Sequence, residues 1–216
     1  EDLTQLITAA QTDEGMNVLH FIVEYGPTDL LDVVVQLVRE GKLSDIETLL
    51  NTPSEFKASP MRLIVELKKT DMLHLLLSSL PELMVDEATM QKAIDSEKSP
   101  LPLLFAKLRP QCATVSFLKS AISLADTEIL EEVLESQSSL FIGCGMLSHA
   151  VTKGDVKVIE VLMRRCPQLA IELDSEGRPA LSHLQEISDL NKRKGARSAV
   201  IPGIIRRTQA ELQSSA

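Results

Sequence analysis

Segment 147–162 contains two short helices separated by a single glycine, and this arrangement constrains the fold more than any other feature. Gly154 is suited to close the first helix in the left-handed conformation, and Asp155 is suited to cap the free amides of the second. Apolar residues recur at helical spacing and form one stripe on each helix: Leu147, Ala150, Val151, Val156, Ile159 and Leu162. One pair of helices cannot bury both stripes, so the segment requires similar neighbours.

Similar breaks occur upstream, near residues 41, 70, 99 and 125, and each precedes an apolar helical run. The pattern Gly-x-apolar-x-x-Ile-Glu-x-Leu is found at both 41–49 and 154–162. The five breaks are 29, 29, 26 and 29 residues apart. A regular period of about 30 residues with two helices per unit is typical of a solenoid in which each repeat packs on the next. The sequence therefore predicts an all-α, helical-repeat solenoid of stacked helix-turn-helix units.

The same reasoning predicts the individual helices and two regions of the chain. A repeat array occupies residues 1–190, and residues 191–216 form a basic connector and a C-terminal capping helix over about 198–213, which covers the last repeat. Short finger-like turns are the most extended structure that we expect. The expected helices span 2–10, 17–25, 29–40, 43–51, 60–69, 71–79, 86–95, 101–108, 113–123, 127–136, 144–152, 155–165 and 178–190.

Residues 15–26 resemble the ankyrin repeat, whose signature is Gly-x-Thr-Pro-Leu-His followed by a later glycine. Asn17 and Val18 stand in place of Thr and Pro, and the matching residues are Gly15, Leu19, His20 and Gly26. A weaker match follows at 174–181, where Gly177 and Leu181 fit the signature but Pro179 comes one place early and Ser182 replaces His. The resemblance implies an ankyrin-like array, in which the matching His20 bonds to the backbone of a neighbouring turn.

The first fifty residues allow two pairings of the predicted helices. The ankyrin-like motif makes residues 18–25 an inner helix, whereas counting back from Gly41 by one period makes the same residues an outer helix. Both pairings predict helices near 17–25, 29–40 and 43–51, so the predicted architecture is the same in either case.

Composition and charge restrict the class of partner. The net charge is −9, but the last thirty residues carry six basic and two acidic residues, a net of +4, which leaves −13 for residues 1–186. An acidic body disfavours nucleic acid, whose binding depends on cationic contacts with phosphate. No apolar run approaches the roughly 18–20 residues needed to span a bilayer, so no membrane contact is expected. The three cysteines fit neither a zinc site nor a disulfide framework, which favours the cytoplasm or nucleus.

No set of residues has the pattern of a catalytic, metal or cofactor site. The four histidines fall in different units, and none forms an i, i+4 pair suited to zinc. Cys144 and His149 point about 140° apart on an ideal helix, because each residue turns roughly 100°. The loop 143–145 lacks the Lys-Ser/Thr pair of a phosphate loop. The acidic residues at 128, 131, 132 and 135 indicate a solvated helix face. We therefore expect no enzymatic activity, no cofactor and no metal.

The function predicted from these features is binding of a partner protein or peptide through the concave face of the array. Such a surface is preformed, so docking loses little ordering entropy. The alternative is a regulatory or targeting segment of a larger enzyme or receptor whose catalytic part lies elsewhere. The basic run 192–197 is interpreted as a solvated connector. Polar residues on the inner helices are the predicted partner contacts: Arg62, Glu66, Lys69, Gln91, Asp95, Lys119, Ser123, His149 and Lys153.

Overall fold

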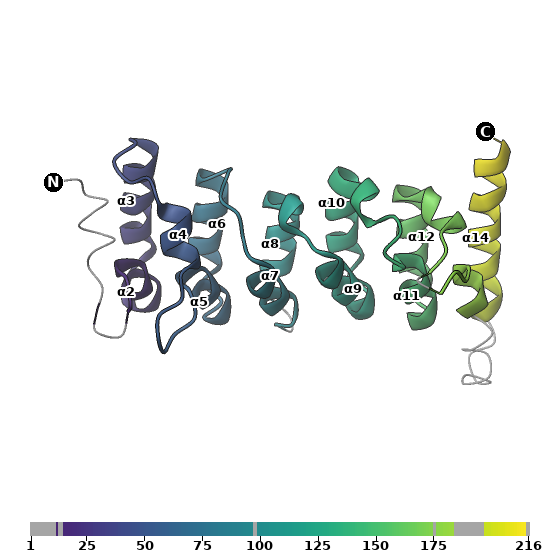
Figure 1. The fold of residues 1–216 in the computed structure, drawn as a ribbon, viewed down its shortest axis with the longest axis horizontal. Helices are drawn as coiled ribbons and strands as arrows, with labels where there is room; N and C mark the ends of the chain where they lie inside the picture. The colour runs from purple at the N-terminus through teal and green to yellow at the C-terminus, as the bar shows by residue number, and fades with distance from the viewer. Residues whose placement is uncertain (1–11, 13–14, 97–98, 175, 184–196, 215–216) are drawn as a thin grey trace. The chain divides into compact units, whose positions relative to one another are not determined.

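The computed structural model describes residues 12, 15–96, 99–174, 176–183 and 197–214 (Figure 1). These residues form helices and turns, with one isolated antiparallel bridge between Leu173 and Pro179. The all-α prediction is therefore confirmed for the described residues, whereas the helix expected at 2–10 lies outside them. The chain divides into two compact units, Glu1–Cys112 and Ala113–Ala216, which we call unit 1 and unit 2.

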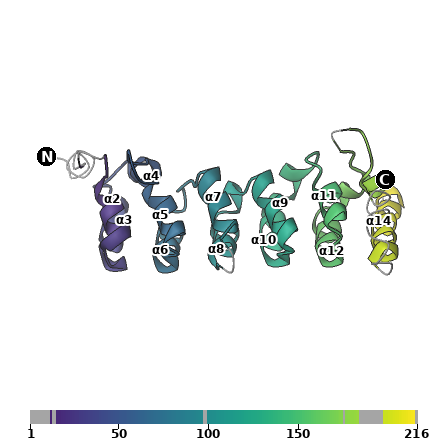
Figure 2. The same ribbon diagram turned by 90° about the horizontal axis from the view of Figure 1, so that it is seen from below.

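Unit 1 consists of short helices in two rows (Figure 2). In the first row, α2 packs on α5 and α5 on α7, while in the second row α3 packs on α6 and α6 on α8. Consecutive helices α2 and α3, α5 and α6, and α7 and α8 also contact each other. The helices are α2 (Val18–Tyr25), α3 (Thr28–Arg39), α4 (Ile46–Asn51), α5 (Pro60–Glu66), α6 (Thr70–Ser79), α7 (Glu87–Ile94) and α8 (Leu101–Leu108).

The position of α2 decides between the two pairings of the N-terminal helices. Because α2 stacks on α5 and pairs with α3, residues 18–25 belong to the first row, as the motif-based interpretation predicts. The predicted helix at 43–51 is shorter than expected and begins at Ile46, and it packs on α5 as part of the connection into the next pair. Leu43 lies in the turn before α4 and not in the helix itself. Its burial there explains why this position is apolar.

Arg109 fixes the end of the second row in unit 1. Arg109 is the residue that directly follows α8 in the sequence, and only 4% of its surface is exposed. The guanidinium donates to the carbonyl oxygens of Leu83 at 3.0 Å and Leu77 at 2.7 Å, and also to those of Leu80 and Leu108. The carbonyls at the C-terminus of a helix carry partial negative charge, so a cation is favoured beside the end of α6. Burial lowers the pKa of Arg109, yet arginine stays protonated in proteins.

Unit 2 repeats the two-row arrangement. Helix α9 (Val115–Leu124) packs on α11 (Met146–Lys153), while α10 (Thr127–Gln137) packs on α12 (Val156–Arg165). The final helix, α14 (Arg197–Ser214), contacts α12 and the 3₁₀ turn η3 (Pro167–Ile171), and it buries Ile201 and Ile205. The last inner helix expected at 178–190 is described only as far as residue 183, where it is the short 3₁₀ turn η4 (Ala180–Ser182).

Aspartate caps open the second-row helices of unit 2. The Oδ1 atom of Asp155 accepts from Val158 N at 3.1 Å, and that of Asp126 accepts from Ile129 N at 3.1 Å. Gly154 has a φ of 72°, as the sequence predicts for the turn before Asp155. The equivalent place before Asp126 is held by Ala125 with a φ of 57°. The turn geometry is therefore the same although the residue is not glycine.

Two of the acidic residues on α10 form ion pairs with α12. Glu131 pairs with Arg164, and Arg165 lies 3.4 Å from Glu131 and 3.2 Å from Glu135. The sequence interpretation of a solvated acidic face is therefore incomplete, because the face also fastens neighbouring second-row helices. Each exposed pair contributes only about 0–1 kcal/mol, and the apolar contacts of the two helices supply most of their packing energy.

Within the described part of the chain, every helix is too short or too polar to cross a bilayer.

Candidate partner-binding surface

Helix α2 is positioned by its first turn. The side chain of Asn17 accepts from the amides of Leu19 and His20, and its Nδ2 donates to the carbonyl of Leu49 at 2.9 Å. His20 is fully buried, and its Nδ1 accepts from Asn17 N at 3.1 Å. Burial lowers the pKa of His20, while the backbone of Ala58 opposes that effect. His20 therefore has a structural role, and its backbone contacts are to Ala58 in the neighbouring turn, as the resemblance implies, and to Asn17 at the start of its own helix.

The turn before α5 lies against the start of α2. A Cβ atom added to Gly15, whose φ is 73°, would lie 3.7 Å from Glu55 N, so the backbone of this turn approaches the glycine closely. The turn is closed by Ser54, whose amide donates to the carbonyl of Lys57 at 3.0 Å and whose hydroxyl accepts from Lys57 N at 2.9 Å. Phe56 and Lys57 are thereby presented next to α2.

Three aromatic side chains are exposed on α2 and this turn, and we call them the aromatic patch: Phe21, Tyr25 and Phe56. Tyr25 and Phe56 are each 72% exposed and Phe21 is 40% exposed. The rings of Phe21 and Tyr25 lie 6.4 Å apart with an interplanar angle of 34°. The chain has only six Phe and Tyr residues, so half of them lie in this small part of unit 1. Exposed aromatic side chains that lie on neighbouring elements are candidates for an interaction surface.

Charged groups surround the patch. The Lys57 ammonium lies 5.9 Å from the centre of the Tyr25 ring and pairs with Glu24. The hydrogen bond from Lys57 lowers the pKa of the Glu24 carboxyl. Lys69, one of the predicted contacts, donates from Nζ to the carbonyl of Glu24 at 3.4 Å. The patch therefore combines aromatic faces with an anionic and a cationic group.

The other predicted contacts of unit 1 form pairs along their own helices. Arg62 Nε lies 3.0 Å from Glu66 Oε1 on α5. On α7, Gln91 Nε2 donates to Asp95 Oδ1 at 2.9 Å. Because α5 and α7 are neighbours in the first row, the structure brings these residues onto adjacent helices. The sequence interpretation considered only polar residues and so missed the aromatic patch, although the scarcity of aromatic residues elsewhere was a visible signal.

The predicted contacts of unit 2 lie on the neighbouring helices α9 and α11. His149 Nε2 lies 3.0 Å from Ser123 Oγ and 3.2 Å from the carbonyl of Lys119. Ser123 also donates to the Lys119 carbonyl at 2.9 Å. Burial first, and then the charge of Lys153, lowers the pKa of His149, which favours the neutral form of the ring.

The Ser123 and His149 contact has a structural explanation. A proton on Nε2 lets His149 donate to the Lys119 carbonyl, which is an acceptor only. In that tautomer Nε2 is not a base for the serine hydroxyl, which instead donates to the carbonyl of its own helix. The pair therefore joins α9 to α11. Within the described part of the chain, no group of three His, Cys, Asp or Glu residues is arranged to hold a metal ion.

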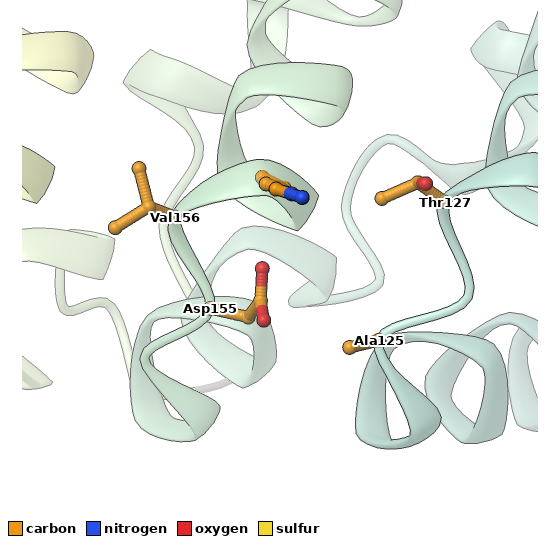
Figure 3. Close-up of a pocket in the computed structure, with 5 residues that line it drawn as sticks. Ala125, Thr127, Asp155 and Val156 are labelled. Atoms are coloured by element: carbon orange, nitrogen blue, oxygen red, sulfur yellow. The ribbon is translucent and has the colours of Figure 1, made fainter.

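A surface hollow of about 500 Å³ lies between the turns that open α10 and α12 (Figure 3). Its lining residues are Ala125, Thr127, Asp155, Val156 and Lys157. Asp155 is already committed to capping α12. The cap of α12 therefore forms part of the wall of the hollow.

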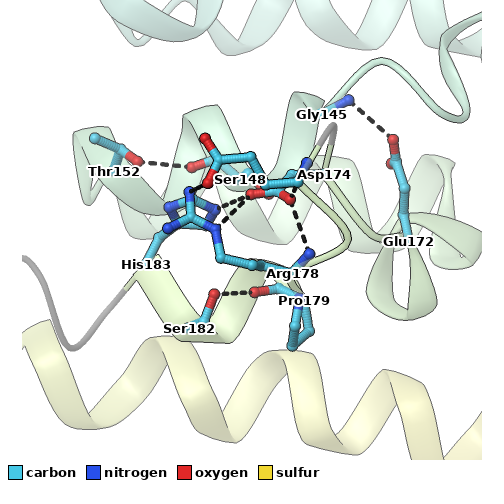
Figure 4. Close-up of polar contacts among 10 residues, drawn as sticks. Gly145, Ser148, Thr152, Glu172, Asp174, Arg178, Pro179, Ser182 and His183 are labelled. Carbon is cyan, nitrogen blue, oxygen red and sulfur yellow. Dashed lines mark hydrogen bonds and ion pairs between the residues drawn. The ribbon is translucent and has the colours of Figure 1, made fainter.

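The finger-like turn at 173–179 is held by Asp174 (Figure 4). Its carboxylate accepts from the amides of Glu176 at 2.9 Å and Arg178 at 2.8 Å, and lies 2.8 Å from His183 Nε2. These hydrogen bonds lower the pKa of Asp174 to about 2, and the bond from the Arg178 amide has the largest effect. His183 thus contacts the turn, although the sequence motif expects histidine at position 182.

Acidification is expected to remove the contribution of Asp174 to stability. The carboxyl has an ordinary pKa of 3.8 and a folded-state pKa of about 2, so its stabilising effect is complete above pH 3.8. That effect is lost as the pH falls toward 2. The difference in Tm between the wild type and Asp174→Asn should therefore be constant near neutral pH and shrink below 3.8. The control is Asp45→Asn, since the Asp45 side chain makes no cap bond to α4. A difference that persists unchanged at pH 2 would refute the assignment.

No known protein-family model matches the chain, and no curated protein matches it either, so its function is argued from its own residues.

Proposed function

We propose that the chain is a non-catalytic binding module, an ankyrin-like repeat array that holds a partner protein on its first-row helices and the turns before them. The observation that carries this proposal is the aromatic patch. Tyr25 and Phe56 keep 72% of their surface in contact with solvent, whereas Phe105 and Phe117 are fully buried. Exposed aromatic side chains that lack a role in the core favour a binding role, because burying them in an interface gains hydrophobic free energy.

Three features support the ankyrin-like assignment. The paired helices are short and stack in two rows within each unit. Asn17 and His20 form a reciprocal cap at the start of α2, at the positions that resemble the family signature. The finger-like turn closed by the Leu173 and Pro179 bridge precedes η4, where the second partial match lies.

The proposed location is the cytoplasm or nucleus. Cys112 and Cys166 are free thiols, and free thiols are typical of a reducing compartment. Burial raises the pKa of the Cys166 thiol, which favours its unreactive protonated form.

Reversing the charge of three predicted contacts is expected to abolish partner capture. The triple variant Arg62→Glu, Lys69→Glu and Lys119→Glu places negative charges against groups of the partner that meet positive charges in the wild type. Such like-charge contacts cost several kcal/mol. Quantitative affinity capture from a cell extract should show specific proteins that are recovered at least about tenfold less by this variant than by the wild type.

The matched control reverses three exposed cations away from the predicted contacts: Arg39→Glu, Lys42→Glu and Lys157→Glu. It makes the same change in net charge and should leave the same proteins bound. Circular dichroism establishes that both variants keep the helical content of the wild type. Equal losses in the two variants, or no protein that distinguishes them, would refute a binding surface on the first-row helices.

A further inference from the structure

The aromatic patch also indicates the chemistry of the partner, an inference that rests on the proposed function. We propose that Tyr25 and Glu24 bind an arginine side chain of the partner, flanked by apolar residues, in the place that Lys57 occupies in the free protein.

Lys57 shows that this place accepts a cation. Its ammonium lies 5.9 Å from the Tyr25 ring centre and pairs with the Glu24 carboxylate. A cation over an aromatic face is attracted by the ring quadrupole, and the adjacent carboxylate adds a second attraction. The guanidinium of arginine suits both groups better than an ammonium, because it is planar, weakly hydrated and able to donate twice to one carboxylate.

The internal lysine and a partner arginine compete for the same two groups. The backbone of Lys57 is held in the turn by Ser54, while its charge reaches Tyr25 through a flexible four-carbon stem. The side chains of Lys57 and Glu24 are 29% and 25% exposed, so solvent reaches the pair. A partner arginine can therefore take the place of the ammonium while the backbone of the turn stays in place.

The charge and the apolar surface around the site favour the same ligand. Residues 1–112 contain eighteen acidic and ten basic residues, a net charge of −8. Unit 1 therefore carries nearly all of the net charge of the chain, which is −9. This field favours a cationic group at the site formed by Glu24 and Tyr25, while partner groups of opposite sign meet Arg62, Lys69 and Lys119. Phe21 and Phe56 offer apolar surface on α2 and the neighbouring turn, which suits aliphatic residues beside the arginine.

The test is an NMR titration of the full ¹⁵N-labelled chain with the peptide acetyl-Leu-Arg-Leu-amide. Its counterpart contains citrulline, which has nearly the shape of arginine without the charge. We expect saturable shifts at the amides of Phe21, Tyr25 and Phe56, and at least about threefold weaker binding of the citrulline peptide. In Lys57→Gln the arginine peptide should bind more tightly, because its internal competitor is removed. In Glu24→Gln the preference for arginine should be lost.

Lys42→Gln is the matched control for Lys57→Gln, since Lys42 also pairs with a glutamate, Glu40, outside the aromatic patch. This control should leave the affinity unchanged. Equal binding of the two peptides, weaker binding to Lys57→Gln, or shifts confined to other residues would overturn the proposal. A dimer that dissociates in Tyr25→Ala would overturn it too, because a second copy would then occupy the patch.

The outcome is separable from that of the proposed function. If the triple charge reversal abolishes partner capture while the peptides show no preference for arginine, the binding surface stands and only the cation assignment fails. If neither experiment distinguishes its variants, both proposals fail.

Discussion

Replacing Arg109 by methionine is expected to destabilise unit 1 by about 3–5 kcal/mol, because each buried carbonyl that loses its donor costs on the order of 1–3 kcal/mol. The substitution keeps most of the aliphatic stem but removes the donors to the carbonyls of Leu77, Leu80 and Leu83. Urea unfolding should show the loss, and hydrogen exchange should locate it in α6 and α8.

The control for this prediction is Lys107→Met. Lys107 also lies near the end of α8 but is exposed. A surface substitution of this kind usually changes stability by no more than about 0.5 kcal/mol. If Arg109→Met costs as little as Lys107→Met, the guanidinium does not hold the end of α6.

Truncation of a core phenylalanine should cost about 3–5 kcal/mol in either unit, through lost transfer free energy and the cavity that remains. Phe105 and Phe117 are both fully buried, the first in α8 of unit 1 and the second in α9 of unit 2. In a stack of repeats each element is stabilised mainly by its nearest neighbours. Hydrogen exchange should therefore accelerate most in α8 and its neighbours α6 and α7 for Phe105→Ala, and in α9, α10 and α11 for Phe117→Ala.

Phe56→Ala makes the same chemical change at an exposed position and is the control. It should alter the free energy of unfolding by no more than about 0.5 kcal/mol. Uniform acceleration of exchange along the whole chain in both core variants would contradict a nearest-neighbour organisation. A large loss in Phe56→Ala would mean that the aromatic patch supports the fold.

Most helices are predictable because their signals are local. The Asp126 and Asp155 caps and the apolar periodicity place α9, α10, α11 and α12 within two residues of the observed ends, whereas the helix expected at 178–190 is the turn η4 as far as it is described. Ala125 shows where residue identity is a poor guide, since it adopts the left-handed turn that Gly154 adopts one pair later. The spacing of breaks along the sequence does not predict the stacking of α2 on α5, because this stacking depends on which apolar helix stripes meet in the folded protein.

The site was predicted only in part, for a related reason. The sequence proposes Arg62, Gln91 and His149 as partner contacts because a polar residue on an amphipathic helix is expected to face solvent, and their role in binding stays a prediction. Tyr25 and Phe21 lie on a helix that buries Leu19 and Val23, and Phe56 lies in a turn with no periodicity. Whether such an aromatic side chain enters the core depends on how the turn before α5 meets α2, which local patterns do not encode.

The arginine and glutamate pairs between α10 and α12 have a consequence for the mechanics of unit 2. They join helices of the second row, whereas α9 and α11 are linked through the neutral Ser123 and His149 contact. Added salt screens exposed charges over a distance that shortens from about 10 Å at 0.1 M to 3 Å at 1 M. Added salt therefore weakens the charged contacts of the second row and leaves the neutral contact of the first row unchanged, so the two sides of unit 2 respond differently to the surrounding electrolyte.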